Sequence, residues 1–396
     1  MLTTDHISET AQRPAAASAV AAPEADPAES SPKAAPVRLA VLDGMRLLAA
    51  GAVASYHYLG PTTPTYWGES PKVFAYPLHH AAMYGWLGVE AFFLISGFVI
   101  CMSAWGRSPG QFAASRISRL FPAYWFAILL IVAQSVLIAV QTKNAARVID
   151  PRTILANLTM LPGPLNVTLL DGVSWTLAVE AVFYVLMAVV LAFGATYGRM
   201  LRFCSLWLVV AFITQQTQSS FLNAIDLSDY TGLFVTGITL YLMYRFGQNL
   251  LLWVLMGLAW CYQLTVLQLR IVGHPADSGT TRTVSYSLCA LLLTGFLVLL
   301  ILATIGPLAR VRWGWLATAG ALTYPFYLVH QSVGVPMGEA LTRHVPGLGH
   351  WGIMGLTLVT MLGLSWLIHR WVERPLGRLM RRQLTRSLNP AEVVRT

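Results

Sequence analysis

The chain has 396 residues, of which 56% are hydrophobic and only 11% are charged, and its mean hydropathy is +0.60. A soluble domain carries about 25% charged residues, so the composition argues against a soluble protein and predicts an integral membrane protein with many spans. The net charge of +9 comes with no basic and aromatic module of the kind that binds nucleic acid. The cysteines stand singly without metal-ligand spacing, so we expect neither a disulfide framework nor a metal site.

The first 36 residues differ from the rest of the chain. They are rich in Ala, Pro, Ser and Glu and almost lack large apolar side chains, so residues 1–36 are expected to form a disordered cytoplasmic tail. They contain no apolar stretch followed by a cleavage site, which argues against a signal peptide. We assign residues 37–376 to a transmembrane domain and residues 377–396 to a basic cytoplasmic tail.

Long apolar runs predict an all-α bundle of about ten transmembrane helices. With the N-terminus in the cytoplasm, 19 of the 26 lysines and arginines fall on the cytoplasmic side. This asymmetry and the even number of spans predict a multi-pass protein of the cell membrane with both termini in the cytoplasm. The expected helices cover residues 40–60, 83–105, 120–141, 175–195, 201–216, 227–244, 249–268, 284–305, 314–335 and 351–371.

The first of these helices carries Arg46 and His57. Eleven residues at about 100° each return to within about 20° of the same face, about 16 Å further along the axis. Arg46 is therefore expected near the cytoplasmic surface, with His57 deeper on the same face. Ionisable residues within a membrane helix are costly and commonly mark a site. The alternative is that Arg46 only reaches for the interface and that His57 only packs.

Three later residues are expected at about the membrane level of His57. They are Glu90 in the second helix, Glu180 in the fourth and His330 in the ninth. We expect the four to share one polar cavity, in which Glu90 or Glu180 orients His57 as a general base. The alternatives are a structural hydrogen bond for each carboxylate and simple packing for His330. Two aromatic residues could line the same cavity or could only pack against their neighbours. They are Tyr324 and Tyr327.

A basic segment lies between the second and third helices and contains Arg116 and Arg119, one helical turn apart. Paired arginines bind phosphate through bidentate hydrogen bonds, although arginines at a cytoplasmic boundary often serve only as topology anchors. Near the end of the tenth helix, Glu373-Arg374-Pro375 is expected to close that helix and could be no more than a helix stop.

These segments together resemble the acyltransferase-3 family of multi-span membrane acyltransferases. The resemblance follows family order from about residue 40 to residue 376. It is carried by Asp43-Gly44-Met45-Arg46 with His57, Gly88 to Phe98, Arg116 to Tyr124, Ser174-Trp175-Thr176-Leu177 with Glu180, Tyr324 to His330, and Glu373-Arg374-Pro375.

The resemblance implies transfer of an acyl group, expected to be acetyl, from cytoplasmic acyl-CoA to a hydroxyl of a sugar, glycan or polyketide. Arg46 with His57 matches the family's paired Arg and His, and Arg116 with Arg119 matches its cytoplasmic basic motif. Glu90 stands where many members carry Asp, and Ala181-Val182 replaces a position where an acid or amide is common. The chain resembles stand-alone members that lack an extracellular hydrolase-like domain.

We expect the phosphates of the donor to rest on Arg46, Arg116 and Arg119 while its pantetheine arm enters the bundle. His57, oriented by Glu180 or Glu90, would then deprotonate the acceptor hydroxyl. No Ser or Cys nucleophile stands out, so direct transfer is expected rather than an acyl-enzyme. Residues expected to contact the substrates are Trp175, Tyr324, Tyr327 and His330.

Two other functions use the same residues. A proton-coupled transporter would employ them as a proton relay, but it predicts matched broken helices in two halves of the chain, and no matched pair is found. A non-catalytic exporter of an acylated glycan is the second alternative.

Overall fold

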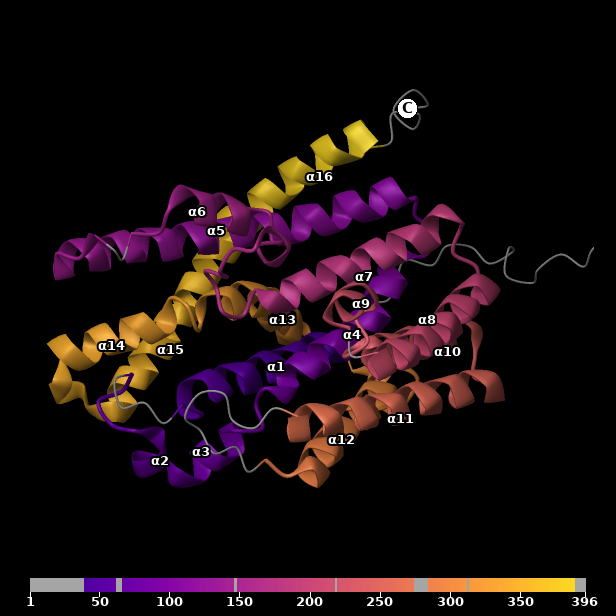
Figure 1. Ribbon diagram of the computed structural model, residues 1–396, viewed down its shortest axis with the longest axis horizontal. Helices are drawn as coiled ribbons and strands as arrows, with labels where there is room; N and C mark the ends of the chain where they lie inside the picture. The colour runs from indigo at the N-terminus through magenta and orange to yellow at the C-terminus, as the bar shows by residue number, and fades with distance from the viewer. Residues whose placement is uncertain are drawn as a thin grey trace, which may run out of the picture. The chain divides into compact units, whose positions relative to one another are not determined.

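The computed structural model describes residues 39–61, 66–145, 148–217, 219–273, 284–311 and 313–388. Within these ranges the regular structure is helical and contains no strand, as the sequence predicts (Figure 1). The tail expected over residues 1–36 lies outside the described residues, as does the end of the chain from residue 389.

Each of the ten predicted ranges overlaps a long helix. Seven helical segments of the described chain are long and apolar enough to cross a membrane, so the protein is a multi-pass membrane protein, and the count of ten spans stays a prediction. The helices are α1 (Ala40–Leu59), α4 (Leu87–Ala104), α5 (Pro109–Thr142), α7 (Trp175–Ala192), α8 (Tyr197–Thr217), α10 (Thr231–Phe246), α11 (Leu250–Gly273), α12 (Tyr286–Thr304), α13 (Gly314–Val329) and α15 (Gly349–Ile368).

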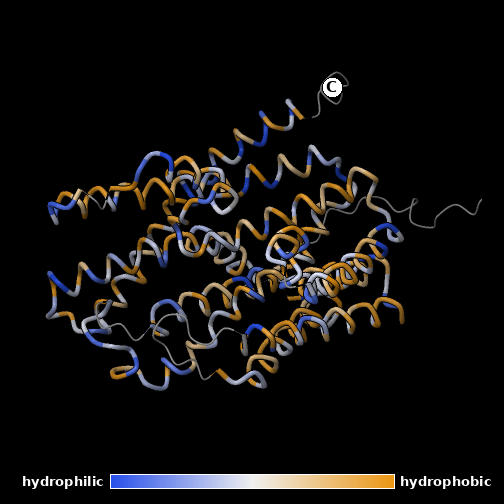
Figure 2. The backbone as a smooth tube through the Cα atoms, in the orientation of Figure 1, coloured by the Kyte–Doolittle hydropathy of each residue, from blue (hydrophilic) through white to orange (hydrophobic). Residues whose placement is uncertain are grey.

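Shorter helices occupy several connections between the long ones. Apolar residues predominate along the long helices, whereas hydrophilic residues gather in the connections and towards the C-terminus (Figure 2). The short helices are α2 (Pro71–Phe74), α3 (Tyr76–Ala82), α6 (Pro151–Leu158), α9 (Ser220–Asp226) and α14 (Gly334–His344), with single 3₁₀ turns at Gly163–Leu165, Pro307–Arg310 and Pro346–Leu348.

Helix α10 lies in the interior, because every residue from Thr231 to Met243 is buried. It packs against α4, α8 and α11. Gly97 of α4 and Gly237 of α10 face each other, and a Cβ atom on either would collide with the backbone of the other helix. Small residues at such crossings let membrane helices approach closely, and here they fix one face of α4 against α10.

The same kind of contact places α1 between α4 and α13. Gly88 of α4 lies against the backbone carbonyl of Ala49, and Gly320 of α13 lies against the side chain of Asp43. Arg46, one turn after Asp43, therefore sits where α1 and α13 cross.

Helix α5 begins at Pro109 rather than near residue 120. Ser108 and Gln111 form a reciprocal capping box, and proline occupies the first turn, which is a strong start signal. At about 1.5 Å per residue its 34 residues span about 51 Å, more than the roughly 30 Å apolar core of a bilayer. Arg116 and Arg119 consequently lie within this long helix, and not in a loop.

Glu373-Arg374-Pro375 does not stop the last predicted helix. A π-helical turn over His369–Glu373 carries α15 directly into α16 (Arg374–Leu388), and the wider turn accommodates the proline that follows. Within the turn, His369 Nδ1 and Glu373 Oε2 are 2.9 Å apart. Helix α16 then packs along α5 (Figure 1).

Candidate active site

A cavity of about 120 Å³ lies between α1, α4, α5, α7 and α13. Five helices thus contribute side chains to a cavity with partly polar walls inside an otherwise apolar bundle. Its polar lining residues are Arg46, Ser96, Arg116, Arg119, Thr176, Glu180, Tyr184, Thr323, Tyr324 and Tyr327. Its other lining residues are Val89, Phe92, Phe93, Ile100, Leu120, Leu177 and Gly320.

All three arginines that the sequence selects line this cavity. Arg46 and Arg116 are half-buried and Arg119 is exposed, so the arginine end of the cavity opens to the surface. Arg46 forms an ion pair with Asp43 at 3.5 Å, whereas Arg116 and Arg119 form none within the described part of the chain. The three arginines outnumber the two carboxylates near them, Asp43 and Glu180, and this excess of positive charge favours an anionic ligand.

Arg116 is held between two aromatic rings. Its guanidinium carbon lies 5.8 Å from the ring centre of Phe112 and 6.0 Å from that of Tyr184, within the range of a cation–π contact. One terminal nitrogen donates to Ser115 Oγ at 3.1 Å, while the buried Nε has no hydrogen-bond partner. The side chain is thus fixed in place with a hydrogen-bond donor left over.

Glu180 shares the cavity with the arginines, and one of its carboxylate oxygens accepts a hydrogen bond from Ser96 Oγ at 3.1 Å. From the sequence, Glu180 was instead expected to lie beside His57. Because α7 contributes Thr176, Leu177 and Glu180 to the cavity, the position of Glu180 follows from the face that α7 turns towards α4 and α5.

His57 and His330 form a separate pair. Their ring centres are 5.4 Å apart, with His57 half-buried on α1 and His330 fully buried just after α13. His330 Nδ1 lies 2.8 Å from the backbone oxygen of Tyr327, a contact that requires the proton on Nδ1. Its Nε2 is then a lone-pair acceptor, and this buried atom has no partner.

Tyr327 connects the histidine pair with the cavity. Its ring centre is 5.7 Å from that of His330 and 5.7 Å from that of Phe92, which also lines the cavity. Its hydroxyl lies 3.0 Å from Thr176 Oγ1 on α7. Tyr327 and Phe92 therefore form the end of the cavity that is nearest to the histidines.

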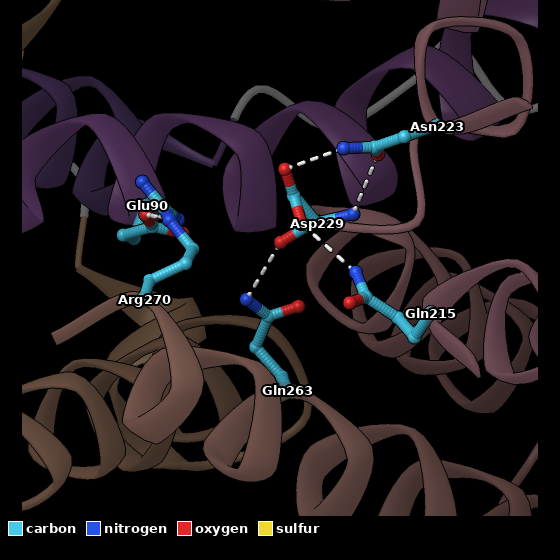
Figure 3. Close-up of polar contacts among 6 residues, drawn as sticks. All are labelled: Glu90, Gln215, Asn223, Asp229, Gln263 and Arg270. Carbon is cyan, nitrogen blue, oxygen red and sulfur yellow. Dashed lines mark hydrogen bonds and ion pairs between the residues drawn. The ribbon is translucent and has the colours of Figure 1, made fainter. Parts of the chain in front are cut away.

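Glu90 of α4 does not line the cavity and contacts Arg270 of α11 instead. It is only 1% exposed, and its Oε1 lies 2.6 Å from a guanidinium nitrogen of Arg270. Figure 3 shows this pair beside a second set of polar contacts, in which Asp229 accepts hydrogen bonds from Gln215 and Asn223. The expectation of one cavity for both carboxylates and both imidazoles therefore does not match the structure.

The aromatic residues that were expected to contact the substrates also lie in two different places. Tyr324 and Tyr327 line the cavity, and the hydroxyl of Tyr324 donates to the backbone oxygen of Leu120 at 2.9 Å. Trp175 does not line it. Its ring packs instead against Phe93 and Tyr230, at 6.4 Å and 6.0 Å between ring centres.

The sequence matches the profile of the acyltransferase-3 family, described as an acyltransferase domain, over residues 39–370. The chain belongs to the acyltransferase-3 family. Membership makes it an acyltransferase, and the transporter alternative is set aside.

Two curated proteins resemble parts of this acyltransferase. Protein 2 in the picA locus of Rhizobium radiobacter is 30% identical over 168 residues, which are 37% of this chain and 79% of that protein. Exopolysaccharide production protein ExoZ of Rhizobium meliloti is 34% identical over 118 residues, 28% of this chain and 35% of that protein. No solved structure matches the chain.

Sequence reasoning missed several polar residues of the acyltransferase cavity. Ser96 lies two turns after Val89, so the two residues share one face of α4, and both line the cavity. This spacing is visible in the sequence and could have indicated Ser96. Tyr184 lies one turn after Glu180 on α7. Asp171, a buried carboxylate that does not line the cavity, was also missed. It lies in the connection before α7, where its Oδ1 accepts a hydrogen bond from Ser332 Oγ at 2.6 Å. Burial raises the pKa of the Asp171 carboxyl to about 7, against the opposing hydrogen bonds from Ser332 and the backbone of Val173.

Proposed function

We propose that the acyltransferase moves an acyl group, acetyl in our expectation, from cytoplasmic acyl-CoA to a hydroxyl of a polysaccharide. The observation that carries the proposal is the cavity that Arg46, Arg116 and Arg119 line inside an apolar bundle. Acyl-CoA combines a highly anionic nucleotide with a long, less polar arm, and this pairing fits an arginine-rich opening that leads inward. The acceptor class rests on the likeness to a protein named for exopolysaccharide production.

The donor would bind with its pyrophosphate on Arg46 and Arg119 at the cavity opening. The pantetheine arm would then pass Glu180 and Ser96, towards Tyr327. That arm contains amide N–H groups, which need acceptors once they leave water. Glu180 is a charged acceptor on this path, so we assign it to positioning the arm and not to orienting His57.

His57 is the proposed general base. It removes the proton of the acceptor hydroxyl, whose oxygen attacks the thioester carbonyl carbon. The carbon–sulfur bond then breaks, an ester forms, and the coenzyme leaves as a thiolate that takes up the proton from His57. The products are the acylated acceptor and free coenzyme A, so atoms and charge balance without another reactant.

The orientation of His57 is supported by His330 in place of a carboxylate. An imidazole nitrogen lies about 1.1 Å from its ring centre and a hydrogen bond between ring nitrogens spans about 3 Å. The ring centres are 5.4 Å apart and His330 Nε2 has no hydrogen-bond partner in the structure, so an N–H of His57 would reach this nitrogen only after a rotation of its ring. That bond would leave the lone pair of the other His57 nitrogen available as the base.

A labelled-donor assay tests the proposal. The protein in lipid nanodiscs would receive acetyl-CoA with a radiolabelled acetyl group, together with soluble exopolysaccharide fragments. We expect label in ester linkage to the polysaccharide, and a 10²- to 10⁴-fold loss in His57→Ala, the usual contribution of a general base. The exposed His80, on α3, provides the control variant His80→Ala with unchanged transfer.

Two results would count against the proposal. If His57→Ala keeps more than a tenth of the wild-type transfer, His57 is not the base. If the wild type neither transfers nor hydrolyses the labelled acetyl group with any polysaccharide tested, while it binds no coenzyme A, the donor assignment is wrong.

A further inference from the structure

A second group of basic side chains lies beside the cavity opening. Arg107, in the connection between α4 and α5, donates to Ser115 Oγ at 3.3 Å, and Arg116 donates to the same oxygen at 3.1 Å. One hydroxyl thus holds two guanidinium groups together. Burial lowers the pKa of Arg107, and the nearby charges of Arg116 and of Arg381 on α16 lower it further.

The packing of α16 explains why Arg381 reaches this place. Gly377 of α16 lies against α5, where an added Cβ atom would be 2.9 Å from the backbone oxygen of Ser118. The close approach brings the following turn of α16, with Arg381, alongside the start of α5. The capped N-terminus of α5 directly follows Arg107, and the positive end of its helix dipole adds to the local potential.

The basic cluster, Arg107, Arg116 and Arg381, carries more positive charge than Glu180, the carboxylate that lines the cavity with Arg116, can offset. None of the three forms an ion pair with a carboxylate in the described ranges, and the buried Nε of Arg116 has no partner. Like charges held together raise the free energy of the site until an anion arrives. An arginine that serves only as a topology anchor would extend into water, whereas Arg107 and Arg116 are tied to one serine.

Arg116 belongs both to the basic cluster and to the cavity lining. An anion on the cluster is thus adjacent to whatever occupies the cavity opening. Coenzyme A carries a pyrophosphate and, on its ribose, a separate 3′-phosphate. A donor with its pyrophosphate at the cavity opening has one remaining phosphate, and the cluster offers a second place for one.

We propose that Arg107, Arg116 and Arg381 form a subsite for the 3′-phosphate of the donor nucleotide. This inference rests on the proposed acyl-CoA donor and extends it. The subsite selects a nucleotide-bearing thioester over an acyl group carried on phosphopantetheine alone, because only the nucleotide supplies the extra phosphate.

Binding of coenzyme A and of 3′-dephospho-coenzyme A tests the subsite without knowledge of the acceptor. Titration calorimetry on the protein in nanodiscs of neutral phosphatidylcholine gives a Kd for each ligand. A hydrogen-bonded contact between charged groups contributes roughly a 10- to 100-fold change in affinity, so the wild type should bind coenzyme A tighter by that factor. Arg107→Gln and Arg381→Gln should lose most of this preference and bind the dephospho form as the wild type does.

The neighbouring Arg382, exposed on the next position of α16, supplies the control. Arg382→Gln should keep the wild-type preference. Retained preference in both Arg107→Gln and Arg381→Gln would overturn the subsite, as would equal binding of the two ligands by the wild type. Equal binding leaves the donor proposal intact, whereas no binding of either ligand refutes the donor proposal itself.

A lipid headgroup is the other source of phosphate near α16. Repeating the titrations in nanodiscs that contain phosphatidylglycerol separates the two sources. The subsite predicts the same coenzyme preference in neutral and anionic bilayers. If the effect of Arg107→Gln appears only in anionic bilayers, the basic cluster binds lipid and the proposal fails.

Discussion

The two buried glutamates differ in what surrounds them. Glu90 and Glu180 were expected at the same membrane level and in one cavity, yet only Glu180 lines the cavity. Glu90 is 1% exposed and is neutralised by Arg270 of α11 at 2.6 Å. Glu180 lines a cavity with three arginines and accepts a hydrogen bond from a serine. A closed ion pair indicates structure, whereas an open polar cavity indicates binding, although the two carboxylates look alike in sequence.

The largest expected effect that tests the difference between the two glutamates is a loss of stability. Glu90→Gln removes the buried carboxylate that pairs with the half-buried Arg270, and breaking a buried ion pair in this way typically costs about 3–5 kcal/mol. We expect a strong loss of thermal stability in detergent, partly recovered in the double variant Glu90→Gln/Arg270→Gln. The exposed pair of Glu69 with His350, 3.3 Å apart, gives the control Glu69→Gln, which should change stability little. An unchanged melting temperature in Glu90→Gln would show that the pair is not structural.

Glu180→Ala should affect transfer more than stability. Loss of a charged acceptor on the path of the donor arm is expected to lower kcat/KM for acetyl-CoA by about 10- to 100-fold, while the melting temperature changes little because Glu180 lines a cavity. Steady-state kinetics and thermal unfolding of the same preparation provide both readouts. A variant that unfolds early yet transfers normally would reverse the roles assigned to the two glutamates.

A third buried carboxylate, Asp171, allows a test by pH. Burial raises its folded-state pKa to about 7, above its value in an unfolded chain of about 3.9. The folded protein therefore holds a proton that the unfolded chain releases, so this contribution to stability is present at low pH and is lost as the pH rises from about 4 to 7. We expect the melting temperature of Asp171→Asn to vary less over this interval than that of the wild type. Identical pH profiles would remove Asp171 as the cause.

Arg46→Lys should produce the smallest change in this set, about a tenfold rise in KM for acetyl-CoA. Lysine keeps the charge but loses the planar, bidentate group that suits a phosphate. If Arg46 only reaches the interface, lysine should substitute freely, so full activity at equal expression would take Arg46 out of the donor site. Arg202→Lys, at an exposed position of α8, is the matched control.

Sequence patterns predicted the long helices well, but they did not predict which residues contact each other between helices. Arg116 and Arg119 were expected to project together because they are one turn apart, and both line the cavity. The partner of Glu90 is 180 residues away in the chain, and no local pattern connects the two. Trp175 is next to the cavity residue Thr176 in the sequence, but its ring packs against Phe93. The direction of its side chain depends on contacts between helices, which a local sequence pattern does not show. The early start of α5 was readable, because Ser108, Pro109 and Gln111 form a known start signal.

Occupancy of the cavity by the donor is the central claim, and cysteine protection measures it directly. Ser96→Cys places a thiol in the cavity lining, while Lys72→Cys, at an exposed position of α2 outside the candidate membrane spans, serves as the reference. Coenzyme A should slow modification of the thiol at position 96 by a small thiosulfonate reagent and leave modification of the thiol at position 72 unchanged. If saturating coenzyme A protects neither position, or protects both equally, the donor does not occupy this cavity.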